Sequence, residues 1–113
     1  MQILNQTQNT ILAKTAVIAD TMASRFVGLL RHHSLLEGEG MVITQCNSIH
    51  MFFMRFSIDV VFVDRNKIVV GLVRDIKPFR MSAYYWRSDC AVELPLGQID
   101  RTKTALGDKL CWG

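Results

Sequence analysis

The sequence predicts a mainly β fold of the α+β class: a small open barrel or a curled antiparallel sheet with one short helix near residues 21–33. Short runs rich in β-branched residues recur between turn signals along most of the chain. The hairpin at 58–74 is apolar on both faces, so other parts of the protein are expected to cover both. With 113 residues, the chain is expected to form a single domain over 1–113.

The first half of the chain predicts a strand, a helix and a second strand. Residues 1–9 are polar and amide-rich, so we expect a frayed end or an added edge segment there. A β-branched run at 10–18 predicts a strand. Asp20 is suited to cap a helix, and apolar residues then recur at helical spacing over 21–33. A short apolar run at 41–44 predicts the next strand.

The second half predicts a hairpin and further short strands. Residues 58–63 and 68–74 are strands by composition, and the polar residues between them form a turn. A two-residue loop would place Val61 opposite Val70. Further elements are predicted at 90–94 and 109–112 (strands) and at 98–105, a polar connection with room for one helical turn.

Composition and charge exclude several classes of protein. Half of the residues are hydrophobic and 20% are charged, as in ordinary folded domains. The net charge is +3 and the basic residues are dispersed, which disfavours a nucleic-acid partner. No signal peptide and no membrane span are recognisable, so no membrane association and a cytoplasmic location are expected. Three widely spaced cysteines do not suggest a disulfide framework.

Two acids interrupt apolar strands, and they are the main candidates for a site. The residues that share a face with Asp59 and with Glu93 are apolar, so both carboxyl groups are expected to be buried. A buried acid needs a cationic or hydrogen-bonding partner or a raised pKa. Arg25 is one candidate partner, and Arg55 could reach Asp59 only if the chain bends between them. A buried acid and its arginine would then form either a structural ion pair or part of a ligand or catalytic site.

The stretch 49–64 concentrates aromatic, methionine and ionisable side chains. His50 is either a general base or a structural histidine, and Met54 lies beside Phe53 in an apolar wall that lines a pocket or fills the core. No nucleophile motif, phosphate-binding loop or metal-ligand spacing occurs, so no catalytic residue is assigned and no metal or cofactor is expected. The candidate ligand-binding residues are Arg25, His50, Met54, Arg55, Asp59 and Glu93.

Five motifs in a fixed order point to a known family. They are RFVGLL from Arg25, EGM ending at Met41, FMRFSIDVVFVD over 53–64, VELPLG over 92–97 and LGDKL over 106–110. Over about residues 13–112 they resemble a bacterial and archaeal family, the domain of unknown function number 192. The resemblance implies a small, mostly β domain with one short helix and no established activity. The family's typical residues fall here on Arg25, Gly28, Leu29, Gly40, Met41, Phe53, Met54, Ile58, Asp59, Glu93, Leu94 and Gly97.

Two departures from the family pattern concern the candidate site. Phe53 stands where tryptophan is commoner, and residues 54–57 differ from the Met-Lys-Asn-Thr of many members. The polar groups near the bend expected between Arg55 and Asp59 therefore differ from those that the resemblance implies.

Three functions are compatible with these features. We expect a non-catalytic binding or accessory module that holds a small molecule or a peptide beside the Met/Phe wall. A hydrolase would instead use Asp59 or Glu93 as its base, with His50 assisting, and would need a water-accessible cleft. A structural protein–protein interaction domain would use the aromatic residues at 79–87. The expected partner is thus a small molecule or another protein.

Overall fold

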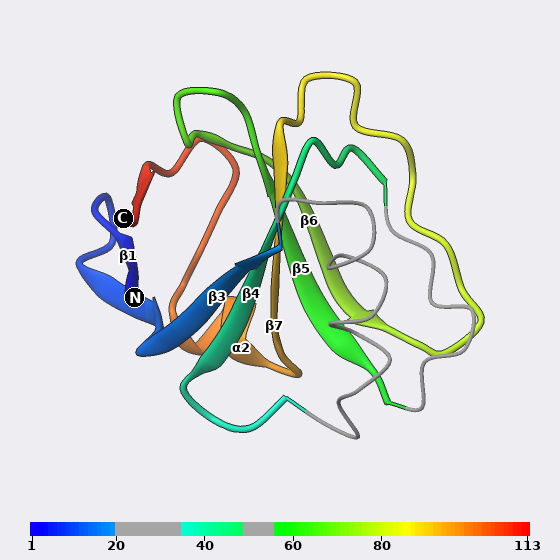
Figure 1. Ribbon diagram of the computed structural model, residues 1–113, viewed down its shortest axis with the longest axis horizontal. Helices are drawn as coiled ribbons and strands as arrows, with labels where there is room; N and C mark the ends of the chain where they lie inside the picture. Colours follow the sequence, from blue (N-terminus) through cyan, green and yellow to red (C-terminus); the bar gives the residue numbers. More distant parts are fainter. Residues whose placement is uncertain (20–34, 49–55) are drawn as a thin grey trace.

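The computed structural model describes residues 1–19, 35–48 and 56–113 (Figure 1). The predicted helix at 21–33 lies outside these residues, and the predicted helical turn after the last long strand is present as α2. The elements of the described residues are β1 (Ile3–Asn5), β2 (Thr10–Ala13), β3 (Thr15–Ala19), β4 (Glu39–Thr44), β5 (Ile58–Val63), β6 (Val69–Ile76), β7 (Cys90–Pro95), α2 (Gln98–Arg101) and β8 (Leu110–Cys111).

The strands form two sheets, with the orders β2-β1-β8 and β3-β4-β7-β5-β6. Only Lys14 separates β2 from β3, so one stretch of chain serves both sheets. An isolated antiparallel bridge also joins Ile68, just before β6, to Lys109, just before β8. Within the described residues the sheets curl toward each other without closing into a barrel, which confirms the predicted mainly β class. The pairing is antiparallel except between β3 and β4, which run parallel.

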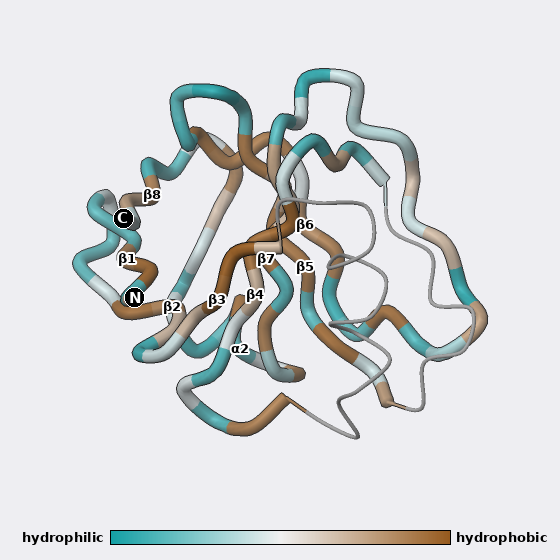
Figure 2. The backbone as a smooth tube through the Cα atoms, viewed as in Figure 1, coloured by the Kyte–Doolittle hydropathy of each residue, from teal (hydrophilic) through white to brown (hydrophobic). Residues whose placement is uncertain are grey.

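The five-stranded sheet carries apolar side chains on both of its faces, as the hairpin pattern predicts. Much of the backbone of its strands is coloured brown, for hydrophobic residues, in Figure 2. The first face of this sheet packs against the three-stranded sheet and α2, and its second face carries a separate core. Consecutive residues of a strand point to opposite faces, so β5 is buried along its whole length. The first core contains Ile3, Leu12, Ala13, Ala16, Val42, Val61, Val63, Val69, Cys90, Val92, Leu94, Ile99 and Leu110, and the second contains Ala19, Met41, Ile43, Ile58, Val60, Phe62, Ile76 and Ala91.

The N-terminus differs from the expected frayed end or edge segment, because β1 is the middle strand of the smaller sheet. Ile3 has no exposed surface, and Asn5 is buried although it is polar. The Asn5 side-chain amide donates to Thr104 Oγ1 at 3.1 Å and to Asp108 Oδ2 at 3.0 Å. These two bonds to the loop before β8 satisfy the donors of the Asn5 amide, so its burial costs little free energy.

The β5–β6 hairpin also differs from the expected two-residue loop. The Lys67 N–H donates to the Asp64 carbonyl at 3.0 Å, but Lys67 has a left-handed φ of 62°, as in hairpins that contain a bulge. A further irregularity in pairing follows within the strands. Val61 therefore faces Leu72, and the expected pairing with Val70 is wrong.

Of the described residues, none belongs to a helix with the length and apolar character needed to cross a membrane.

Candidate functional site

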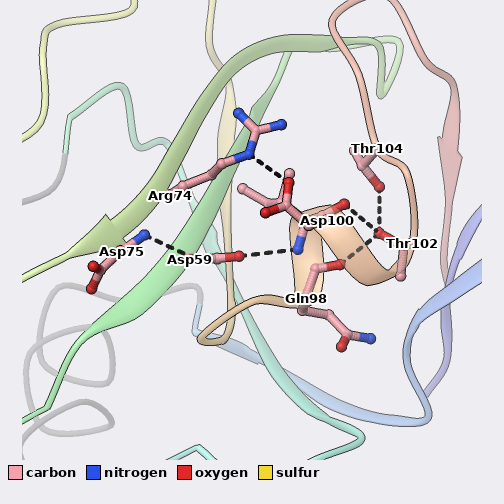
Figure 3. Close-up of polar contacts among 8 residues, drawn as sticks. Asp59, Arg74, Asp75, Gln98, Asp100, Thr102 and Thr104 are labelled. Carbon is pink, nitrogen blue, oxygen red and sulfur yellow. Dashed lines mark hydrogen bonds and ion pairs between the residues drawn. The ribbon is translucent and has the colours of Figure 1, made fainter.

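Asp59 lies near the start of β5, with 1% of its surface exposed, and both of its carboxylate oxygens accept backbone hydrogen bonds (Figure 3). The Asp75 N–H donates to Oδ1 at 2.9 Å. The Ile99 N–H donates to Oδ2 at 3.0 Å. Asp59 thus connects three elements, because it belongs to β5 while its donors belong to β6 and α2.

A bulge in β6 explains the first of these bonds. Two residues of β6, Arg74 and Asp75, lie opposite the single residue Asp59 of β5. Such a bulge leaves a backbone amide without a partner in the ladder. Asp75 has a left-handed φ of 53°, and its N–H finds an acceptor in the Asp59 carboxylate.

The start of α2 explains the second bond. The first N–H groups of a helix have no acceptor within the helix, and a side chain at the N-cap usually provides one. Here the N-cap is Gly97, whose φ of 88° suits the turn after β7 but which has no side chain to accept a bond. Asp59 supplies the missing acceptor from a neighbouring strand, through the Ile99 N–H.

Glu93 lies in the middle of β7, with no exposed surface and a different environment. It pairs with Met41 of β4 and with Val60 of β5, both residues of the second core. Neither carboxyl oxygen of Glu93 has a hydrogen-bond partner among the residues that the structure describes. Burial disfavours the charged form and raises the pKa of Glu93 to about 8.

The two acids point to opposite faces of the same sheet. Asp59 pairs with Leu94, a residue of the first core, whereas Glu93 pairs with residues of the second core. In register, Asp59 and Glu93 are one position apart along their paired strands, and that single step reverses the face. The Asp59 and Glu93 side chains therefore do not meet on one face, and Arg25, whose guanidinium they were expected to share, lies outside the described residues.

Four of the six sequence-predicted site residues lie outside the described residues: Arg25, His50, Met54 and Arg55. The prediction that Asp59 and Glu93 are buried is confirmed. Among the described residues, two backbone amides donate to Asp59 and neither acid forms an ion pair, while the expected cationic partners Arg25 and Arg55 lie outside those residues.

An aromatic contact on the second face was not predicted. The ring of Tyr85 stacks on that of Phe62, with centroids 4.5 Å apart. It also lies above Gly71, where an added Cβ would be 2.5 Å from a ring carbon of Tyr85. A glycine inside an apolar strand is the sequence signal for such a close approach.

Fold and site together define a class of protein: a small, mainly β protein with two buried acids on opposite faces of a mixed sheet, one with backbone donors and one without a donor among the described residues. The chain belongs to the DUF192 family, described as "Uncharacterized ACR", whose model matches residues 3–112. This confirms the resemblance seen in the sequence motifs.

Archaeal relatives match almost the whole chain. A UPF0127 protein of Pyrococcus horikoshii is 35% identical over 113 residues, covering 97% of this chain and 97% of its own. A UPF0127 protein of Thermococcus sibiricus is 34% identical over 114 residues, covering 97% of this chain and 73% of its own.

Two solved structures share the fold. A protein of unknown function from Novosphingobium aromaticivorans matches with a TM-score of 0.85 and 19% identity, over 99% of this chain and 84% of that one. A putative transcription regulator from Sinorhizobium meliloti matches with a TM-score of 0.78 and 17% identity, over 97% of this chain and 89% of that one. At these identities the likeness concerns the fold alone.

Proposed function

We propose that the protein is a non-catalytic binding module in which the Glu93 carboxyl group contacts a small ligand through a cationic or hydrogen-bond-donating group of that ligand. The observation that supports this proposal is the complete burial of Glu93 without a hydrogen-bond partner among the described residues.

Burial of the Glu93 carboxyl group costs free energy. A buried polar group without a partner destabilises a protein by about 1–3 kcal/mol, and more if the group is charged. An apolar residue at the centre of β7 would avoid this cost, because the neighbours Met41, Val60 and Ala91 are apolar. Asp59 shows that this fold can supply donors to a buried acid. An acceptor to which no described residue donates is therefore suited to receive donors from a ligand.

The chemistry of the site favours a ligand with an amine or guanidine group. A carboxyl with a pKa near 8 is mostly neutral at pH 7, and a cation placed beside it would draw it into the charged form. Two carboxyl oxygens to which no described residue donates also match the paired N–H groups of a guanidine. Because the carboxyl is enclosed, such a ligand would reach it through a minor, more open conformation.

Binding is better supported than hydrolysis. A general base needs a pKa near the working pH, which Glu93 has, and access to the proton it removes. Glu93 has no exposed surface, so substrate and water would have to reach it anew in every turnover, whereas a bound ligand has to enter only once. Asp59, the other proposed base, already uses both oxygens to accept backbone N–H groups.

A ligand screen tests the proposal. The thermal unfolding of the protein is measured at neutral pH with a panel of amines and guanidines and with carboxylic acids of the same carbon skeletons. Saturating ligand raises the melting temperature, since it binds only the folded state. We expect shifts from cationic compounds only, and we expect Glu93→Gln to lose them while it remains folded.

A matched control is Glu37→Gln, which removes one carboxylate from the surface. This variant is expected to keep every shift that the parent protein shows. If no cationic compound raises the melting temperature, or if Glu93→Gln responds like the parent, Glu93 is not a ligand contact and the proposal fails.

A further inference from the structure

The connection between β6 and β7 places aromatic and basic residues on the surface, and we call residues 77–87 the aromatic segment (Figure 1, drawn in yellow). Single exposed apolar residues are normal on a protein, but several close together mark an interaction site. Four large apolar side chains of this segment are exposed by 63–78% of their surface: Phe79, Met81, Tyr84 and Trp86.

The aromatic segment is attached to the rest of the protein near its C-terminal end. The Tyr85 ring stacks on Phe62 of the second core, and the Tyr85 N–H donates to the Asn47 carbonyl at 2.7 Å. The Asn47 side-chain amide also donates to the Tyr84 hydroxyl at 2.9 Å. Trp86 is therefore held beside a half-buried anchor, Tyr85, while it is itself 78% exposed. An aromatic group presented in this way loses little conformational freedom when a partner binds it.

The charge of the aromatic segment is of one sign. It contains Lys77, Arg80 and Arg87, and no acidic residue occurs from Ile76 to Ser88. The Lys77 Nζ lies 2.8 Å from a carboxylate oxygen of Asp75. Within the described part of the chain, the exposed side chains of Arg80 and Arg87 form no ion pair. Two guanidinium groups are thus available beside the exposed rings.

We infer that the aromatic segment is a docking surface for an acidic, apolar-containing segment of a partner protein. Carboxylates of that partner would pair with Arg80 and Arg87, since a guanidinium binds a carboxylate through two parallel hydrogen bonds. Its apolar side chains would pack against the exposed rings. Tryptophan, tyrosine and arginine are also the residues that most often dominate the binding energy of protein interfaces.

A peptide fits this surface better than a membrane or a nucleic acid does. Each basic residue adds only a small increment to binding at an anionic membrane, so stable attachment needs a larger basic cluster. Binding to nucleic acid likewise grows with the number of phosphates that are neutralised. Two guanidinium groups without an ion pair among the described residues are few for either surface, but they are enough to orient one short peptide.

Peptide selection tests the inference. A random dodecapeptide library displayed on phage is selected against the full chain, and the recovered peptides are labelled for fluorescence anisotropy. We expect them to combine Asp or Glu with large apolar residues and to bind less tightly as salt is added. Arg80→Gln/Arg87→Gln and Trp86→Ser should each bind at least about tenfold more weakly.

Two control variants change equally exposed residues elsewhere. Arg65→Gln/Lys103→Gln removes two surface charges, and Leu106→Ser removes a side chain that is 66% exposed. Both are expected to bind the selected peptides as the parent protein does.

Several results would overturn the inference. These are a selection that enriches no peptide, peptides without acidic residues, or unchanged binding by Arg80→Gln/Arg87→Gln. Tighter binding to phosphatidylserine vesicles or to oligouridine than to the peptides would assign the surface to lipid or RNA. Self-association in sedimentation that the same double variant abolishes would assign it to a second copy of this chain.

Discussion

Asp59 and Glu93 are two buried acids in adjacent strands of one sheet, and they differ in what the fold gives them. Asp59 faces the first core and accepts two backbone N–H groups from elements that would otherwise leave those donors unpaired. Glu93 faces the second core, where the described residues provide no donor. The same chemical group can thus be part of the framework on one face and remain available for other chemistry on the opposite face. Predictions about this pair can separate the two roles.

The largest effect is expected for Asp59→Ala. Removing the carboxylate deletes two hydrogen bonds to a charged acceptor and leaves the N–H groups of Asp75 and Ile99 without it, which should destabilise the protein by about 3–5 kcal/mol. Urea denaturation at neutral pH measures the change. The control is Asp64→Ala, because Asp64 also accepts two backbone N–H groups, from Asn66 and Ile68, but at a partly exposed turn. Equal losses for the two variants would contradict the role given to burial.

Glu93→Gln is expected to stabilise the protein at neutral pH. The folded-state pKa of Glu93 is raised to about 8 from 4.5, so between these values the unfolded chain releases its proton while the folded protein keeps it. Stability therefore falls as pH rises through this window, and at pH 7 the variant should be more stable by on the order of 3 kcal/mol.

Denaturation of parent and variant from pH 4 to pH 9 checks this linkage. The two proteins should be about equally stable at pH 4, where the acid is protonated in both states, and should diverge up to about pH 8. A difference in stability between the parent protein and Glu93→Gln that instead stays constant from pH 4 to pH 8 would show that the carboxyl has donors in the folded state. The site proposal would then lose its support, whereas the prediction for Asp59 would be unaffected.

The third effect concerns the second face, where Gly71 lies beneath Tyr85. In Gly71→Ala the new Cβ would lie 2.5 Å from the Tyr85 ring, so the ring must leave Phe62. Overpacking of this kind should cost about 2 kcal/mol in a denaturation experiment. In a Tyr85→Ala background the same change should cost little, because the clash is gone. Additive losses in this double-mutant cycle would show that Tyr85 does not anchor the aromatic segment through this contact.

The sequence predicts the burial of both acids correctly, because burial depends on neighbours two positions away along the same strand. It cannot predict that they face opposite sides, since that depends on the register that pairs Asp59 with Leu94. Nor does the sequence reveal the donors to Asp59. They are backbone amides, which every residue except proline has whatever its side chain. The polar N-terminus misleads for a related reason: Asn5 is buried by its bonds to Thr104 and Asp108, about a hundred residues away.

The smallest effect is expected for Arg74→Gln, which tests a second link between β6 and α2. Arg74 Nε lies 2.8 Å from Asp100 Oδ1, next to the Asp59 bonds, but the two side chains are 51% and 73% exposed (Figure 3). Water screens such a pair, so its loss should change stability by no more than about 0.5 kcal/mol. Denaturation in low and high salt should give nearly the same small difference. A cost of the size expected for Asp59→Ala would instead mean that α2 is held by the surface ion pair, and that the buried carboxylate is not its main attachment to the sheet.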